Sequence, residues 1–158
     1  MTVVTNTVRI LGQADAVFDL MTTARLWPQW HPATTAVGGV VERPFQLGSI
    51  VREQAQIGQH LRQGNWTVVE HERPRHVLLR MEGDRLHIRY DLIADGDSAV
   101  LIRQLEFHPE DFAGSLPNPA LLVSLMQSQS EEALVKLKHL VERILQTERE
   151  LTPSIMRA

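Results

Sequence analysis

The sequence has no cysteine and few aromatic side chains. Without cysteine, its 158 residues cannot form disulfide bonds, thiolate metal sites or a cysteine nucleophile. Aromatic residues make up only 5% of the chain, namely three tryptophans, one tyrosine and four phenylalanines. A core with so few large rings is difficult to fill completely, which favours an interior with some empty space.

The chain also lacks a strong charge of either sign. Sixteen lysines and arginines stand against 19 aspartates and glutamates, which gives a formal net charge of -3. This balance argues against a generic nucleic-acid binder and against a polybasic protein of membrane surfaces. We therefore expect no nucleic-acid partner.

Long apolar runs are absent as well. The longest run has only a few residues, whereas a membrane-spanning helix needs about 20. The first ten residues contain no basic region followed by an apolar stretch and no small-residue cleavage site, so we expect no signal peptide. These absences predict a cytoplasmic protein with no integral membrane segment.

The remaining composition is that of an ordinary globular domain. Apolar residues account for 43% of the chain and charged residues for 22%, and neither an internal repeat nor a flexible linker divides it. A length of 158 residues fits one hydrophobic core. We predict a single domain over residues 1–150 and a C-terminal tail over residues 151–158, after Thr152-Pro153.

The first forty residues predict a strand followed by short helices. Residues 3–11 are rich in β-branched side chains, which is typical of a strand. Ala14, Val17, Phe18 and Met21 then recur at the spacing of one helical face. Prolines soon after this segment keep the helix short.

The middle of the chain predicts six short strands separated by turn residues. Alternation is clear in the last two, where apolar and polar side chains succeed one another with period two, as expected for an antiparallel sheet with one buried face. The predicted strands are Ala36–Glu42, Ser49–Ile57, Gly64–His71, Val77–Glu82, Leu86–Ala94 and Ala99–His108.

The last segment predicts a long helix. Asn118-Pro119 is a favourable start, and an apolar stripe continues to about Thr147. A continuous helix would have roughly 30 residues and a length of about 45 Å. The capping-box pattern Ser128–Glu131 offers the alternative of a second helix beginning there. We favour one helix, with or without a kink.

Together the elements predict an α+β fold in which a curved seven-stranded antiparallel sheet wraps round the long helix and leaves a cavity between them.

Several segments resemble the START-like superfamily, in particular its polyketide cyclase/dehydrase and lipid-transport branch. The similarity covers nearly the whole chain and implies the helix-grip fold, with a hydrophobic pocket entered near the loops. It says little about function, because the superfamily contains binders, transporters and enzymes. The segments that carry it are Ala16–Leu20, Leu26–Pro32, Trp66–Glu70 before Pro74-Arg75, Tyr90–Leu92 before Asp95–Asp97, and Glu132–Lys138.

Two tryptophans and a histidine form the first candidate group. Trp27, Trp30 and His31 could line the pocket mouth, with His31 as a polar contact or a general acid/base. The alternative is a structural plug that fixes the route from helix to strand. The resemblance favours the plug, because in this family the motif looks mostly structural.

The second candidate group lies on the predicted strands. Arg103 shares a strand face with Leu101, Leu105 and Phe107 and should therefore point inward. A buried arginine needs an anionic partner, either a ligand carboxylate or phosphate or a protein acid. Tyr90 also shares an apolar face and is either a pocket group or a core tyrosine with a satisfied hydroxyl. Arg89 should point the opposite way.

The third candidate group lies on the long helix. Leu122, Leu125 and Met126 would form an apolar wall, and Gln129 or Ser130 would face the ligand, unless the polar cluster there marks a kink or a helix start. The seven histidines do not form a metal motif: in His71–His76 the second histidine comes one residue late and a proline intervenes. We expect neither a metal nor a cofactor.

These observations favour a module that binds a small hydrophobic ligand such as a lipid, an isoprenoid or a polyketide. Such a module would bind, transport or sense its ligand. The first alternative is a cyclase/dehydratase-like enzyme that uses the same cavity, with His31, Tyr90 and Arg103 as candidate groups. The second is an interaction or stress-response domain with a vestigial pocket. No catalytic constellation is forced by the sequence, and formation of a homodimer is left open.

Overall fold

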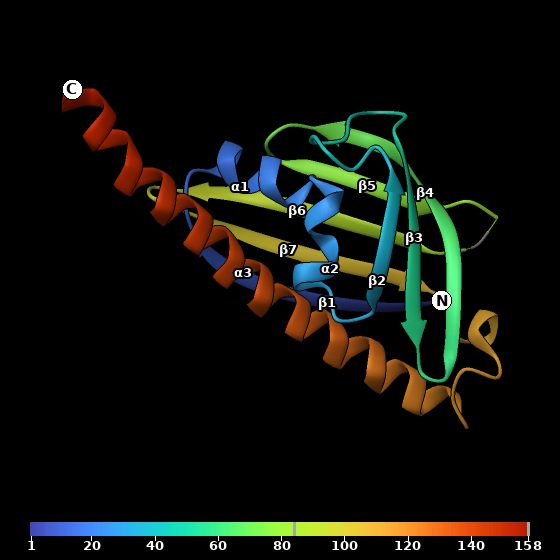
Figure 1. Ribbon diagram of the computed structural model, residues 1–158. Coiled ribbons are helices and arrows are strands. Elements are labelled where there is room, and N and C mark those ends of the chain that lie inside the picture. Colours follow the sequence, from blue (N-terminus) through green and yellow to red (C-terminus); the bar gives the residue numbers. More distant parts are fainter. Residues whose placement is uncertain (84, 158) are drawn as a thin grey trace.

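A computed structural model describes residues 1–83 and 85–157, with side chains described up to residue 151. In this part of the chain, one strand and three short helices precede six consecutive strands, a further short helix and one long C-terminal helix (Figure 1). The elements in order are β1 (Thr2–Leu11), α1 (Ala14–Met21), the 3-10 helix η1 (Ala24–Leu26), α2 (Trp27–Trp30), β2 (Thr34–Gly39), β3 (Ile50–Ile57), β4 (His60–Glu72), β5 (His76–Met81), β6 (His87–Asp95), β7 (Ser98–Phe107), the 3-10 helix η2 (Pro109–Phe112) and α3 (Pro119–Arg157).

The strands form one antiparallel sheet in the order β1-β7-β6-β5-β4-β3-β2. Strands β2 to β7 follow one another as a meander, and β1 joins the β7 edge in full register from Thr2↔Phe107 to Leu11↔Ser98. The sheet curls round α3, which runs along its open side (Figure 1). This architecture confirms the predicted helix-grip fold.

Alternation decides which side chains enter the core. Every second residue of β7 is buried, and the intervening residues are half-exposed. The same alternation holds in β6 from Ile88 to Leu92. The predicted inner faces of both strands are therefore confirmed. The buried side of α3 supplies the opposite wall of the core, through Leu122, Met126, Ala133, Leu134, Leu137, Leu140 and Val141.

Two strands differ from the prediction by more than one residue at an end. The strand expected at Ala36–Glu42 lies at Thr34–Gly39, with an irregularity in its pairing between Thr34 and Ala36. It ends at Gly39, where φ is +85° and a Cβ would lie 2.6 Å from the carbonyl oxygen of Ile50, so that no other residue fits easily. Strand β4 begins at His60, earlier than expected, because backbone pairing with β3 continues through its polar residues.

The long helix is continuous, as favoured, and no second helix begins at Ser128. It ends later than expected, at Arg157 rather than near Thr147, so that residues 151–157 continue the helix. The apolar stripe could not predict the last turns of α3, because the helix there projects beyond the sheet and has no apolar surface to cover (Figure 1). Side-chain bonds along its surface support it instead: Gln146 Nε2 donates to Glu150 Oε1 at 3.1 Å, and Arg149 Nη2 donates to Gln146 Oε1 at 2.8 Å.

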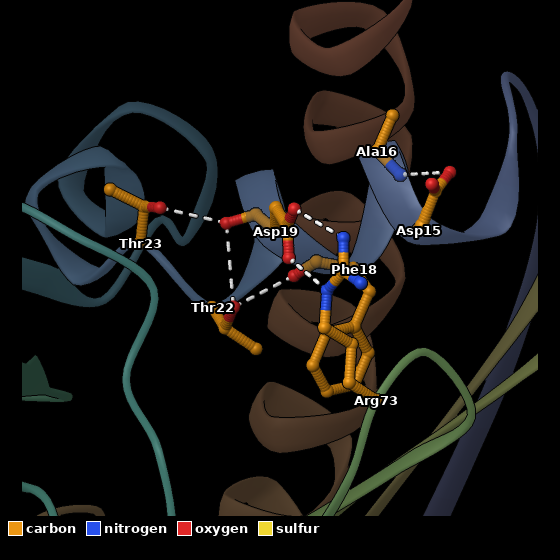
Figure 2. A network of polar contacts seen from close by, with 7 residues as sticks. All are labelled: Asp15, Ala16, Phe18, Asp19, Thr22, Thr23 and Arg73. Atoms are coloured by element: carbon orange, nitrogen blue, oxygen red, sulfur yellow. Dashed lines mark hydrogen bonds and ion pairs between the residues drawn. The ribbon is translucent and has the colours of Figure 1, made fainter.

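A polar network holds the end of α1 (Figure 2). The guanidinium of Arg73, in the turn after β4, donates two hydrogen bonds of 2.8 Å to the carboxylate of Asp19. The hydroxyls of Thr22 and Thr23 donate to the carbonyl oxygens of Phe18 and Asp19, at 2.8 and 2.7 Å. These contacts fix the direction in which the chain leaves α1 and enters η1 and α2.

The turn between β3 and β4 requires glycine at position 58, and this requirement can be tested. Gly58 has φ +58°, and a Cβ there would lie 2.3 Å from the carbonyl oxygen of Ser115. Gly96 has nearly the same φ, +61°, with open space around it. Gly96→Ala is expected to lower the free energy of unfolding by about 1 kcal/mol, from backbone strain alone. Gly58→Ala should lower it clearly further in urea denaturation, because the clash adds to the strain. Equal losses would contradict the close approach to Ser115.

Candidate functional site

A cavity lies between α3 and the inner face of the sheet. Its volume is about 80 Å³, and its apolar wall includes Ile57, Leu79, Ile88 and Leu105. This is smaller than the several hundred Å³ typical of sites for drug-sized ligands. A larger ligand would have to displace flexible lining side chains such as Met81 or Met126.

Arg103 is the innermost charge of this cavity. It points inward from β7 with a relative exposure of only 2%, which confirms its predicted orientation. Its Nε donates to Tyr90 Oη at 3.1 Å and its Nη1 donates to Ser130 Oγ at 2.8 Å. Its Nη2 lies 3.2 Å from His31 Nε2. None of these partners among the described residues is a carboxylate, so the hydrogen bonds hold the guanidinium in place without neutralising it.

His31 follows α2 and faces Arg103 as a neutral imidazole. Burial, together with the positive charge of Arg103, lowers the pKa of His31 from 6.5 to about 3. A neutral imidazole has one N–H and one acceptor nitrogen. His31 Nδ1 lies 3.2 Å from the backbone N–H of Ala33, and its Nε2 faces Arg103, so two donors converge on a ring that can accept from only one. One of the two donors therefore has no acceptor on His31.

Glu53 is the acidic member of the site, and it was not predicted from the sequence. It points into the cavity from β3, where its Oε2 accepts from Thr34 Oγ1 at 2.6 Å and its Oε1 accepts from Trp66 Nε1 at 3.0 Å. Burial raises the pKa of Glu53, although both hydrogen bonds and the charge of Arg103 oppose the rise. One signal could have found it: Val51, Ala55 and Ile57 lie at even spacing from Glu53, on the same strand face.

The raised pKa of Glu53 predicts a pH effect on stability. The folded protein holds this proton more tightly than the unfolded chain, whose pKa is near 4.5. The resulting stabilisation is complete below pH 4.5 and is lost as the pH rises through the pKa of the folded state. Glu53→Gln should therefore gain stability relative to wild type with rising pH, by at most about 1.4 kcal/mol per pH unit. Urea denaturation between pH 4 and 8 measures this difference, and a constant difference would contradict it.

The structure brings most of the predicted site residues to one cavity. Arg103, Tyr90 and His31 meet at its polar end, and Ser130 joins them from α3. Leu122 and Leu125 do not line it: Leu122 is buried in the core one turn before Met126, and Leu125 is half-buried against the core. Arg89 is half-exposed on the other side of β6. The predicted residues that line the cavity are Trp27, Trp30, His31, Tyr90, Arg103, Met126 and Gln129.

The two tryptophans combine structural packing with a place in the cavity wall. Trp27 packs edge-on against Phe45, with 6.1 Å between ring centroids, and its Nε1 donates to the carbonyl oxygen of Met21 at 3.3 Å. Trp30 is 2% exposed, and its buried Nε1 has no hydrogen-bond partner among the residues that the structure describes. Packing of this kind agrees with the structural plug, while both rings also line the cavity.

The described residues offer no metal site and no membrane span. No group of three or more histidine, aspartate or glutamate side chains in this part of the chain is placed to hold a metal ion. None of the helices described combines the length and hydropathy that crossing a bilayer requires.

A long helix gripped by a curled antiparallel sheet, with an apolar cavity between them, defines a START-type ligand-binding domain. The model of the family described as polyketide cyclase/dehydrase and lipid transport matches residues 1–142. The chain therefore belongs to this family. None of the curated proteins matches the sequence.

Solved structures share the fold at low sequence identity. A START superfamily protein from Mycobacterium smegmatis is 18% identical, with a TM-score of 0.69 over 90% of this chain and 98% of its own. The Zhui aromatase/cyclase from a Streptomyces species is 15% identical, with a TM-score of 0.69 over 91% and 95%. The Aha1 dimer from Colwellia psychrerythraea is 13% identical, with a TM-score of 0.64 over 90% and 97%. At these identities the likeness shows the fold alone.

Proposed function

We propose that the protein binds a small hydrophobic ligand in the cavity between α3 and the sheet. The observation that carries this proposal is the guanidinium of Arg103, the one buried arginine side chain among the described residues, at one end of a largely apolar cavity. Apolar burial would drive binding at about 25 cal/mol per Å². Arg103, Tyr90 and Gln129 would orient the polar end of the ligand.

Native mass spectrometry of the gently purified protein, followed by lipid extraction, tests this proposal. We expect a co-purifying hydrophobic molecule that is lost in Arg103→Met. Arg89→Met is the matched control, because Arg89 lies on the outer side of β6 and should leave the bound molecule in place. A protein that carries no such molecule and binds no apolar probe would contradict the proposal and leave the domain with a vestigial pocket.

A cyclase/dehydratase-like enzyme is the second candidate function. It is supported by two titratable groups in one cavity whose environments shift their pKa values in opposite directions, upward for Glu53 and downward for His31. Such separation is common where one group acts as acid and another as base. Conversion of the co-purified molecule during incubation, abolished in Glu53→Gln, would favour the enzyme. An unchanged molecule would favour the binder.

A further inference from the structure

The charges inside the cavity are few and can be counted. Besides Glu53, four titratable side chains line the cavity in the described part of the chain: His31 follows α2, Arg62 lies on β4, Tyr90 on β6 and Arg103 on β7. Arg62 is anchored at the rim, with its guanidinium 4.1 Å from the ring centroid of Phe112 and its Nη1 donating to the carbonyl oxygen of Asp111. The lining residues of β2, β5, η2 and α3 are apolar or neutral. The inner charge balance is therefore Glu53 against Arg103.

The hydrogen-bond partners of Glu53 can serve both the carboxylate and the carboxylic acid. Trp66 Nε1 can only donate, and it is directed at Oε1. Thr34 Oγ1 can donate or accept, and it lies 2.6 Å from Oε2. A proton on Oε2 would simply reverse the direction of this second hydrogen bond. Glu53 can therefore gain or lose a proton with no change in its packing.

Arg103 has N–H donors that its three contacts do not use. Its guanidinium carries five N–H bonds, and three contacts engage one each. A carboxylate, with two oxygens and a single charge, matches the two N–H bonds that remain. The backbone N–H of Ala33 and Nη2 of Arg103 both approach His31, whose neutral ring has only one acceptor nitrogen. One of these two donors is therefore also free beside this position.

We infer that the cavity takes a hydrophobic ligand that bears a carboxylate, and that one proton enters with the ligand and binds Glu53. This inference rests on the proposed function and names its ligand class. A second anion beside ionised Glu53 would leave one guanidinium facing two negative charges in an apolar enclosure, which is unfavourable. Protonation of Glu53 restores one cation against one anion. The proton comes from solvent and no covalent bond of the ligand changes.

Octanoate and its neutral match 1-octanol are suitable probes, with affinity measured by isothermal titration calorimetry from pH 5.5 to 9. Octanoate should bind with constant affinity below the pKa of Glu53 in the free protein and tenfold more weakly per pH unit above it. Glu53→Gln should bind octanoate with no such slope. Arg103→Met should lose at least tenfold for octanoate and keep 1-octanol, and Arg89→Met should match wild type.

The outcomes separate this inference from the proposed function. If neither probe binds, both fail. If 1-octanol binds as tightly as octanoate, the carboxylate is not recognised and the inference is overturned, while the hydrophobic cavity stands. If octanoate binds with no pH slope in wild type, the proton step is overturned. If the slope survives in Glu53→Gln but disappears in His31→Gln, the proton binds His31 and the inference is again overturned.

Discussion

Trp30→Ala is expected to lower the free energy of unfolding by about 3–5 kcal/mol, as is usual for removing a buried tryptophan ring. Trp30 is 2% exposed, lines the cavity and packs against His31 with 6.1 Å between ring centroids. Its loss would widen the cavity and leave neighbouring side chains without contacts. Urea denaturation monitored by far-UV circular dichroism measures the effect.

Trp30→Phe is the matched control for this prediction. It keeps an aromatic ring and removes an indole N–H that is buried with no partner in the described part of the chain, so the cost of lost volume is largely offset. We expect its stability to lie within about 1 kcal/mol of wild type. A loss in Trp30→Phe as large as in Trp30→Ala would mean that the indole nitrogen makes an essential contact, which contradicts the structure.

A second large effect is expected on acidification. The pKa of His31 is about 3 in the folded protein and near 6.5 in the unfolded chain, so below pH 6.5 the unfolded chain binds a proton that the folded protein excludes. The contribution of neutral His31 is thus complete above pH 6.5 and is lost as the pH falls from 6.5 to 3. The limiting slope is about 1.4 kcal/mol per pH unit, and the partial exposure of His31 makes the expected slope smaller.

The difference between His31→Gln and wild type isolates this effect from the titration of other groups. Denaturant unfolding at several values between pH 7 and 4 should show the variant gaining on wild type as the pH falls. His139→Gln is the control variant, because His139 lies on α3 and does not line the cavity. Gln129→Glu would be unsuitable, because it adds a charge to the cavity. Parallel pH profiles for His31→Gln and His139→Gln would contradict the low pKa of His31.

Much of the fold could be predicted because its strands alternate cleanly. In β6 and β7 each inward position is apolar except Arg103, and this regularity fixed both the inner face and the direction of that arginine. Where polar residues interrupt the pattern, as from His60 to Gln63, the strand boundary could not be placed. The end of α3 was misplaced for a related reason, since a solvated helix has no apolar stripe to mark it.

The site residues that could be predicted are those whose inward direction follows from alternation along a single strand. Tyr90 and Arg103 followed from alternation on neighbouring strands. Glu53 did not, because Arg52, Gln54 and Gln56 surround it with polar neighbours that conceal its inward position. The approach of His31 to Arg103 joins residues 72 positions apart and depends on how α2 packs on the sheet. Such contacts arise from tertiary packing and have no local signal.

The pairing of β1 with β7 has a consequence for the order in which the protein folds. The meander from β2 to β7 consists of neighbours in sequence and can form early, whereas β1 must wait for a partner about a hundred residues away. During synthesis α3 emerges after all seven strands, and it carries Met126, Gln129 and Ser130. The cavity is therefore completed only after the whole sheet has been synthesised. Until then the nascent sheet exposes its apolar concave face to the surrounding solution, where it is open to aggregation or to chaperones.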